Sequence, residues 1–322
     1  MTEGLRDALL RAGHQVEILT MPFKFFPESE VLKATEGWLK QDLNQFNGYT
    51  IDRLISLQFP AFYANHENKT LWLMHQHRAV YELYDEKNAS KDLKKLKNEI
   101  KKYDDKILPS FKKRYAMSKT VAERAKRYNG IDSVVLYHPP FNEERFYNKE
   151  PFNYLFFPSR LEELKRQYLL IEAMRYVKTP VKAIIAGEGG QKVRYQKMIE
   201  EYDLKERVSL IGEITEEEKY TLYARSLGVF FTPYDEDYGY VTLEAMLSCK
   251  PVITCKDSGG VLEFVEDGTN GFVLSNSPFE LAEKIDFLYE NRKKAKEMGR
   301  AGYEIYFQKN ISWDNVVSKL AD

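Results

Sequence analysis

The chain has 322 residues, of which 43% are hydrophobic, and 48 lysines and arginines balance 49 aspartates and glutamates. This composition indicates a folded protein with room for two domains, and the formal net charge of −1 gives no reason to expect a nucleic-acid partner. No apolar run has the length of a membrane span, the N-terminus shows no signal-peptide pattern, and Cys249 and Cys255 lie in no His/Cys cluster. We therefore expect a cytoplasmic protein without disulfides or a metal site.

The first half of the chain predicts helices alternating with strands. Residues 4–13 are expected to form a helix that ends at Gly13, and residues 14–20 a strand. Further strands are predicted in "RLISLQFP" (53–60), "TLWLMHQH" (70–77) and "KRYAMSK" (113–119).

The segment "PPFNEERFYNKEPF" (139–152) has three prolines and no regular period, which indicates a linker near residues 138–152. We accordingly predict an N-terminal domain over residues 1–145. The second domain covers residues 146–322 and includes a C-terminal helix.

A lysine-rich segment lies within the first domain. Nine lysines occur between Lys91 and Lys113, while Leu93, Leu96, Ile100 and Tyr103 recur at helical spacing. This pattern predicts an amphipathic helix with a basic outer face. Such a helix is either an ordinary solvated surface element or a peripheral contact with an anionic membrane at its inner face. The first interpretation is the simpler one.

The second half predicts a parallel sheet more clearly. Short apolar runs that read as strands buried on both faces alternate with amphipathic segments that read as crossover helices. The predicted strands are "YLFFPSR" (154–160), "VKAIIAGEG" (181–189), "RVSLIG" (207–212), "GVFFTPY" (228–234) and "KPVITCK" (250–256).

The stretch "EDYGYVTLEAM" (236–246) places two carboxylates around a predicted helix start. Glu236 lies on the turn that follows a strand, at the sheet edge where open α/β folds bind ligands. Gly239 lets the backbone approach a ligand, and the first helix amides, from Tyr240 to Thr242, are suited to a phosphate. Glu244 follows about one helical turn later. Carboxylates bind sugar hydroxyls well and phosphates poorly, so the arrangement suits a molecule that carries both.

Other strand-to-helix turns place candidate ligand-binding residues at the same edge of the sheet. Arg160 and Lys165 flank the turn after the strand at 154–160, where two cations can neutralise a diphosphate. The turns "AGEGG" (186–190), which contains Gly187, and "KDSGGVLEF" (256–264), which contains Gly259 and Gly260, are weaker signals.

Together these motifs resemble the donor-binding domain of the retaining glycosyltransferases of family 4, which have the GT-B fold of two facing Rossmann-like domains. The resemblance runs in order through "PSRLEELKR", "AGEGG", "VSLIGEI", "EDYGYVTLEAM", "KPVIT" and "SGGVLEFVEDGTNGF". It implies that Arg160 and Lys165 bind the donor's diphosphate, that Glu236 holds hydroxyls of the transferred sugar, and that Glu244 bonds the ribose. Asp237 departs from the glycine usual there and leaves the sugar open. Further implied donor contacts are Gly187, Gly239, Tyr240, Thr242, Gly259 and Gly260.

The N-terminal half resembles the acceptor domain of the same family. The resemblance places His75 in the cleft beside the donor sugar, with His77 and Arg78 as candidate acceptor-side residues. His14, His66 and His138 are expected to be structural. The aromatic segment at residues 21–30 touches an acceptor or a membrane, or is a packed loop.

The resemblance implies transfer of a hexose from a UDP- or GDP-linked donor to a hydroxyl acceptor, with retention at the anomeric carbon. Cell-surface polysaccharide or glycolipid synthesis is the expected setting, and no metal is expected. Arg160, Lys165, Glu236 and His75 are the expected catalytic residues. Two alternatives remain open: a non-catalytic sugar-nucleotide-binding subunit, which includes a truncated remnant of a transferase, and a sugar-nucleotide epimerase.

One expectation concerns the N-terminus. An acceptor domain of this family opens with a strand and a glycine-rich turn, whereas "MTEGLRDALL" reads as the helix that follows them. We therefore expect Met1 to be an internal start that lacks roughly twenty residues. Such a chain would bind a nucleotide through its second domain but transfer sugar poorly.

Overall fold

The computed structural model describes residues 1–321, and these divide into two compact units. Unit 1 comprises Met1–His138 together with the residues from Ser312 on, and unit 2 comprises Pro139–Ile311. The change of unit falls at the prolines of the predicted linker. We expected the C-terminal helix to belong to the second domain, but it belongs to unit 1.

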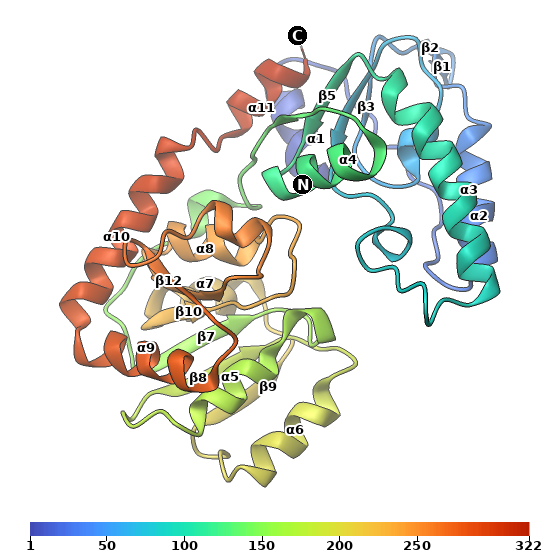
Figure 1. Cartoon of the computed structure of the whole chain (residues 1–322). Coiled ribbons are helices and arrows are strands. Elements are labelled where there is room, and N and C mark those ends of the chain that lie inside the picture. The colour runs from blue at the N-terminus through green and yellow to red at the C-terminus, as the bar shows by residue number, and fades with distance from the viewer. Residues whose placement is uncertain (322) are drawn as a thin grey trace. The chain divides into compact units, whose positions relative to one another are not determined.

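Unit 1 contains a four-stranded parallel sheet in the order β3-β4-β5-β6 (Figure 1). The predicted strands at 53–60, 70–77 and 113–119 are present within it. The elements are α1 (Thr2–Arg11), α2 (Glu28–Leu39), β1 (Gln45–Phe46), β2 (Tyr49–Thr50), β3 (Leu54–Ser56), η1 (Ala61–Tyr63), β4 (Lys69–Leu73), η2 (Arg78–Val80), α3 (Lys91–Ile107), η3 (Leu108–Ser110), β5 (Lys113–Ala116), α4 (Lys119–Asn129), β6 (Val134–Val135) and α11 (Trp313–Leu320).

The strand predicted for residues 14–20 is wrong. These residues follow α1 but pair with no strand in the described chain, and the sheet ends at β3. An apolar alternation favours extended backbone, but a strand also needs a neighbour that exchanges backbone hydrogen bonds with it. Val16 instead packs against the core of the unit.

The core of unit 1 explains where the C-terminal helix lies. Leu5 and Leu9, one turn apart on α1, pack in one cluster with Val316 and Leu320, one turn apart on α11. Trp72 of β4 completes the cluster and donates from its indole N–H to a backbone carbonyl of the same unit. Burial of these apolar faces against each other holds α11 on unit 1.

Helix α3 has the predicted amphipathic character. Ser90 caps its first turn, Leu96 and Ile100 are buried, and its lysines lie on the outer side. The buried row also contains a carboxyl group that the pattern did not single out. Asp104 is fully buried and accepts hydrogen bonds of 2.6 Å from the hydroxyls of Tyr63 and Tyr81. Burial raises the pKa of Asp104 to about 7.

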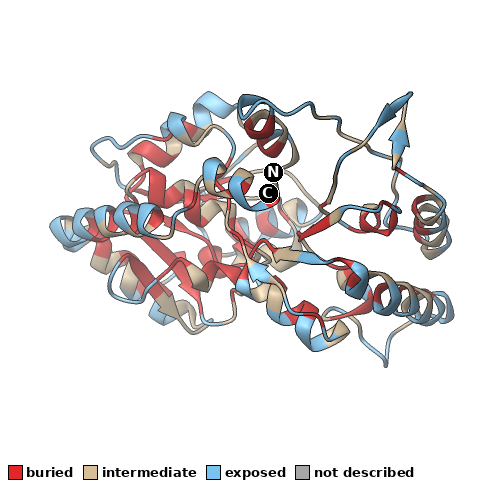
Figure 2. Ribbon diagram, turned by 90° about the horizontal axis from the view of Figure 1, so that it is seen from above, coloured by how far each residue is buried: buried red, intermediate tan, exposed pale blue. Residues whose placement is uncertain are grey.

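Unit 2 contains a six-stranded parallel sheet in the order β12-β11-β10-β7-β8-β9, and most of its strand residues are buried (Figure 2). All five predicted strands are present, and β12 joins them. The elements are η4 (Glu143–Arg145), β7 (Tyr154–Pro158), η5 (Glu163–Lys165), α5 (Gln167–Met174), β8 (Lys182–Ala186), α6 (Lys192–Glu201), β9 (Val208–Gly212), α7 (Glu216–Arg225), β10 (Gly228–Phe230), α8 (Tyr240–Leu247), β11 (Val252–Cys255), η6 (Gly260–Glu263), β12 (Gly271–Leu274), α9 (Pro278–Glu290) and α10 (Arg292–Gln308).

The strand order reverses beside β7. The chain runs from β7 outwards through β8 to β9, then returns to the other side of β7 as β10. The loops that leave β7 and β10 therefore start from adjacent strand ends at the carboxyl edge and lead to opposite sides of the sheet. Doubly wound sheets bind ligands at such a point. No helix among residues 1–321 combines the length and the apolarity that a membrane span requires.

Candidate functional site

The loops after β7 and β10 bring together two of the predicted residues. Lys165 ends η5, and its Nζ lies 2.5 Å from Oε2 of Glu236 on the loop after β10. About a fifth of each side chain is exposed, so this ion pair can still be reached by a ligand. The expected cation and the expected sugar-binding carboxylate are thus direct partners.

Arg160 lies on the same loop as Lys165 but is exposed. Its carbonyl accepts a hydrogen bond of 2.8 Å from the side chain of Gln167, while its guanidinium has no hydrogen bond or ion pair with any described residue. An exposed arginine without a protein partner retains all of its donors for an anion.

Arg166 is a residue that we did not predict. It is buried, takes a left-handed backbone conformation (φ 56°), and forms a bidentate pair with Asp257 at 2.7 and 2.9 Å. It also donates to the carbonyls of Thr232 and Pro233. The arginine therefore joins the loops after β7, β10 and β11. The sequence predicts the adjacent Lys165 as a ligand contact, whereas no sequence pattern distinguishes Arg166 from a surface charge.

The glycines of the site fix its loops against each other. Gly259 has a φ of 62°, and a Cβ there would lie 2.6 Å from the carbonyl oxygen of Glu236. The amide of Gly260 donates to that same oxygen at 2.7 Å. This amide of an implied donor contact is thus engaged with Glu236, where residues 236 and 259 form a backbone bridge. Gly187 similarly packs its loop against the carbonyl of Ser159.

Gly239 begins helix α8 in a left-handed conformation with a φ of 86°. Its carbonyl accepts the amide of Thr242, and a Cβ at this glycine would meet the side chain of Val261 at 2.8 Å. Tyr240 is the first helical residue. The hydroxyl of Thr242 is buried without a hydrogen-bond partner among residues 1–321. The start of α8 presents backbone N–H groups and the positive end of the helix dipole beside Glu236.

Glu244 lies in the second turn of α8 and is mostly buried, with 13% of its side chain exposed. Its Oε2 accepts a hydrogen bond of 2.6 Å from the hydroxyl of Tyr223, and its Oε1 lies 3.6 Å from Nζ of Lys219. Burial raises the pKa of this carboxyl, and the two α7 residues only partly offset that effect. Neither α7 residue was predicted, because the crossing of α7 and α8 is a tertiary feature.

Three residues of the "HQHR" segment in unit 1 lie in different environments. His75 is half-buried, and its Nδ1 lies 2.8 Å from the carbonyl of Gln76. His77 is buried and stacks on Phe59, and burial followed by the nearby His75 lowers its pKa to about 4. Arg78 pairs with Glu82 at 2.6 Å. His77 and Arg78 thus have structural partners, and His75 is the more accessible histidine.

Two of the histidines that are expected to be structural are held by neighbouring groups of the protein. His66 bonds the carbonyl of Ile51, and His138 is fully buried between Trp72 and Trp313. Within residues 1–321 no three His, Cys, Asp or Glu side chains are grouped so that they could hold a metal ion.

Residues 141–305 match the family model described as "Glycosyl transferases group 1". An uncharacterized glycosyltransferase of Methanocaldococcus jannaschii is 31% identical over 189 residues, which are 58% of this chain and 51% of that protein. The poly(ribitol-phosphate) alpha-N-acetylglucosaminyltransferase of Staphylococcus aureus is 34% identical over 165 residues, which are 50% of this chain and 33% of that protein. The matched segments thus span a third to a half of these relatives.

Among solved structures, HepE of Anabaena in complex with UDP and glucose superposes with a TM-score of 0.68 at 20% identity. The superposition covers 98% of this chain and 87% of that one. At this level of identity the likeness concerns the fold.

Proposed function

The chain belongs to the group 1 glycosyl transferases, and we propose that it moves a hexose from a nucleotide-diphosphate sugar to a hydroxyl acceptor with retention at the anomeric carbon. It is a glycosyltransferase with the GT-B fold. The donor, the stereochemical course and the acceptor are the proposed parts. UDP or GDP is the proposed carrier of the sugar, without a metal ion, and a glycan or lipid-linked hydroxyl is the proposed acceptor.

The pairing of Lys165 with Glu236 carries the proposal. It places an ammonium and a carboxylate 2.5 Å apart where the strand order reverses, beside the start of α8. A donor of this class has a diphosphate that needs positive charge and a sugar that needs hydrogen-bond acceptors. Lys165 can contact the diphosphate while Glu236 accepts from sugar hydroxyls, and the exposed Arg160 adds a second cation.

The proposed chemistry follows from where charge develops. As the bond between the anomeric carbon and the β-phosphate oxygen breaks, negative charge builds up on that oxygen. Lys165, Arg160 and the first amides of α8 would stabilise the charge more in the transition state than in the ground state. The acceptor hydroxyl forms the new bond on the same face of the sugar and passes its proton to the departing phosphate. His75 is the proposed catalytic residue of unit 1, beside the donor sugar.

Glu244 is the proposed ribose contact. Its carboxylate is held by Tyr223 and faces Lys219, so one of its oxygens already has a hydrogen-bond donor before any ligand arrives. A carboxylate that is oriented by its neighbours loses little conformational entropy on binding.

A thermal-shift panel of free UDP, GDP and their hexose conjugates tests the binding part. A ligand at about a hundred times its Kd stabilises the native state by about 2.7 kcal/mol. The matching conjugate is then used in a transfer assay with a hydroxyl acceptor and nuclear magnetic resonance of the product anomer. Stabilisation with retained anomeric configuration supports the proposal. Product of inverted configuration contradicts it, and binding without turnover points to a non-catalytic sugar-nucleotide-binding subunit.

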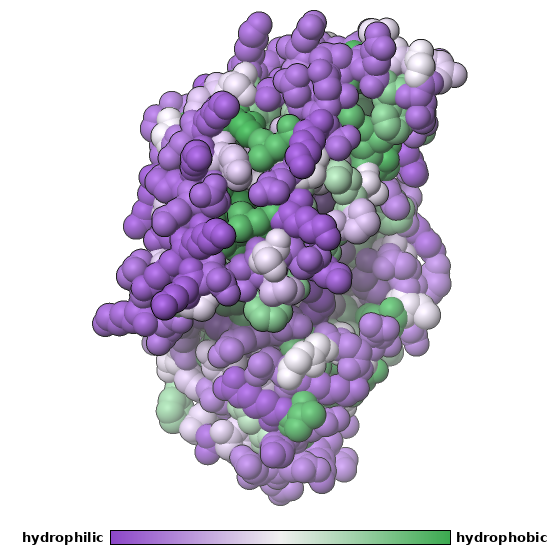
Figure 3. All heavy atoms as spheres, turned by 90° about the vertical axis from the view of Figure 1, so that its right-hand side faces the viewer, coloured by the Kyte–Doolittle hydropathy of each residue, from purple (hydrophilic) through white to green (hydrophobic). Residues whose placement is uncertain are grey.

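A peripheral contact with an anionic membrane is also proposed for unit 1. The outer side of α3 carries exposed lysines, and Phe25 and Phe26, before α2, are 72% and 75% exposed. Figure 3 shows the side of the molecule on which α2 and α3 lie in Figure 1, where a mainly hydrophilic surface contains apolar patches. Exposed basic residues and exposed aromatic residues on one unit both favour the interface of an anionic bilayer.

A further inference from the structure

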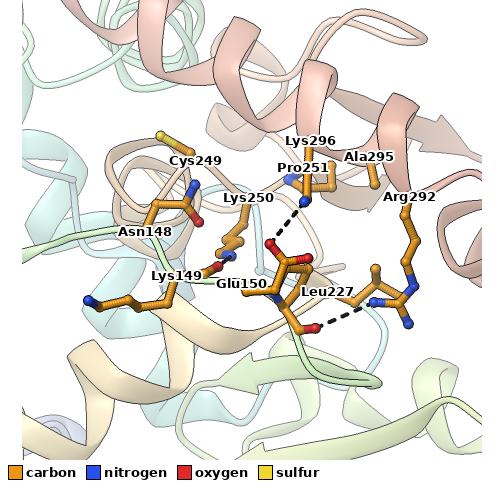
Figure 4. Close-up of a pocket in the computed structure, with 11 residues that line it drawn as sticks. Asn148, Lys149, Glu150, Leu227, Cys249, Lys250, Pro251, Arg292, Ala295 and Lys296 are labelled. Carbon is orange, nitrogen blue, oxygen red and sulfur yellow. Dashed lines mark hydrogen bonds and ion pairs between the residues drawn. The ribbon is translucent and has the colours of Figure 1, made fainter.

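A pocket lies in unit 2 at the edge of the sheet opposite to Lys165 and Glu236. Its volume is about 360 Å³, and it lies where β10 and β11 begin (Figure 4). Four parts of the chain line it: the segment before β7, the residue before β10, the connection from α8 to β11, and the start of α10. The lining residues are Asn148, Lys149, Glu150, Pro151, Leu227, Cys249, Lys250, Pro251, Arg292, Ala295 and Lys296.

The pocket is strongly cationic. Four of its side chains are basic and one is acidic. The carboxylate of Glu150 is already used by Lys296 at 2.9 Å, as Figure 4 shows. The guanidinium of Arg292 bonds the side chain of Asn153 and lies 3.4 Å from the carbonyl of Pro151. The remaining positive charge has no carboxylate in the pocket to offset it.

Lys250 is the unusual member of this set. It is 4% exposed, and its Nζ makes one hydrogen bond, of 3.2 Å, to the carbonyl of Lys149, with no ion pair to any residue among 1–321. An ammonium group has three donors, and a buried charge without a counter-charge is costly. Burial accordingly lowers the pKa of Lys250 to about 8. An anion in the pocket would supply the missing acceptors and the missing charge.

The start of α10 adds to the field. Its first turn contains Arg292 but no acidic residue, and no side chain caps it. Helices commonly place carboxylates there, because the N-terminal end of the dipole attracts negative charge. Here the same attraction is left for a ligand, and it acts together with Lys250 at the opposite wall of the pocket.

We propose that this pocket binds a small molecule through a phosphate group that contacts Lys250. A volume of about 360 Å³ equals roughly twelve water molecules and falls within the range of small-ligand sites. It therefore has room for a phosphorylated sugar as well as for free phosphate. The pocket shares no residue with the proposed donor site, so it is a separate anion site that goes beyond the transfer reaction.

Calorimetry with inorganic phosphate and with glucose 6-phosphate tests the proposal. The titrations use the full chain carrying Arg160→Ala and Lys165→Ala, which removes the cations of the donor site. Adding Lys250→Met keeps the aliphatic stem and deletes the charge, and we expect the affinity to fall at least tenfold. Lys294→Met, on α10 but not among the residues that line the pocket, should change the affinity less than twofold. If glucose 6-phosphate binds more tightly than inorganic phosphate, the ligand is an organic phosphate. If the two bind equally, the phosphate group alone accounts for the affinity.

A second measurement does not depend on the folding of the Lys250→Met variant. With ¹³C-lysine labelling and Lys250→Arg as the assignment variant, the Lys250 signal of the otherwise unaltered chain is titrated with pH. Phosphate must raise the pKa of Lys250, and its affinity must fall as the pH rises through about 8, because the bound form requires the ammonium. No heat at about 10 mM of either probe, or a Lys250 titration that phosphate leaves unchanged, overturns the proposal.

Discussion

Lys165 and Glu236 form an ion pair of 2.5 Å between residues that are 71 positions apart in the chain. The pair exists because β7 and β10 are neighbours in the sheet, so their carboxyl-end loops lie side by side. A cation that already neutralises Glu236, the proposed sugar-binding carboxylate, lowers the repulsion that this carboxylate would exert on an incoming diphosphate. In the proposed complex, the ammonium therefore lies between the two negative groups.

Loss of either member of this pair should abolish most of the transfer activity. We expect Lys165→Ala and Glu236→Gln each to lower kcat/KM by about 10²–10³-fold, the usual effect of deleting one electrostatic contact to developing charge. Steady-state kinetics with the identified donor measures this. Lys205→Ala, which breaks the exposed pair with Glu200, is the matched control and should retain full activity. Near-normal rates for Lys165→Ala would mean that the reaction takes place elsewhere.

Glu244 should act on the affinity for the nucleotide more than on the rate of transfer. Glu244→Gln is expected to weaken binding of free UDP or GDP by about tenfold or more, since the proposed ribose contact loses its charge and one of its two acceptor oxygens. Tyr223→Phe removes the 2.6 Å hydrogen bond that orients the carboxylate and should give a smaller loss. Calorimetry gives both values. A tighter-binding Glu244→Gln variant would contradict the ribose role.

Gly259 and Gly268 provide a matched pair for the packing of the site. Both have a positive φ, of 62° and 74°, but a Cβ at Gly259 would lie 2.6 Å from a backbone oxygen, whereas a Cβ at Gly268 would have nothing within 4 Å. Gly268→Ala should cost only the conformational strain of about 1–2 kcal/mol. Gly259→Ala should cost more and should also reduce activity, because it displaces Glu236. Chemical denaturation compares them, and equal losses would contradict this account.

The buried Asp104 predicts an inverted pH dependence of stability. Its pKa is raised from 3.8 to about 7, so between these values the native state holds a proton that the unfolded chain has released. The free energy of unfolding should therefore fall as the pH rises from about 4 to about 7, by at most about 1.4 kcal/mol per unit, and level off above. Asp104→Asn should remove this slope, and the exposed Asp105→Asn should keep it. Urea titrations at several pH values decide the matter.

The membrane proposal predicts an effect of salt and of two aromatic side chains. Binding to anionic vesicles should appear at low ionic strength and weaken as salt screens the lysines of α3. The double variant Phe25→Ser and Phe26→Ser should bind several-fold less, because each exposed ring loses its burial in the interface. Tyr49→Ser, at another exposed aromatic of unit 1, is the control. Equal partitioning onto neutral and anionic vesicles would exclude the electrostatic part.

The sequence predicted the strands and site loops of unit 2 because buried parallel strands leave continuous apolar runs with polar residues at their carboxyl ends. It could not predict which loops touch, since the contact of Lys165 with Glu236 depends on the strand order. Arg166 escaped notice because its role depends on a left-handed backbone and on Asp257, 91 positions away. The prediction of a strand at residues 14–20 was wrong for a related reason, because hydrophobic alternation does not indicate whether a neighbouring strand is available for pairing.

The position of α11 has a consequence for biosynthesis. Val316 and Leu320 are fully buried in the cluster that contains Leu5 and Leu9, so the core around α1 cannot close until residues 316–320 have been translated. Domains commonly fold in the order in which the ribosome releases them. Here residues 139–311 are all released before unit 1 has its final helix, so unit 2 can reach its native state first. Until α11 has been made, the nascent chain exposes the apolar face of α1, and exposed apolar surface of this kind is what chaperones bind.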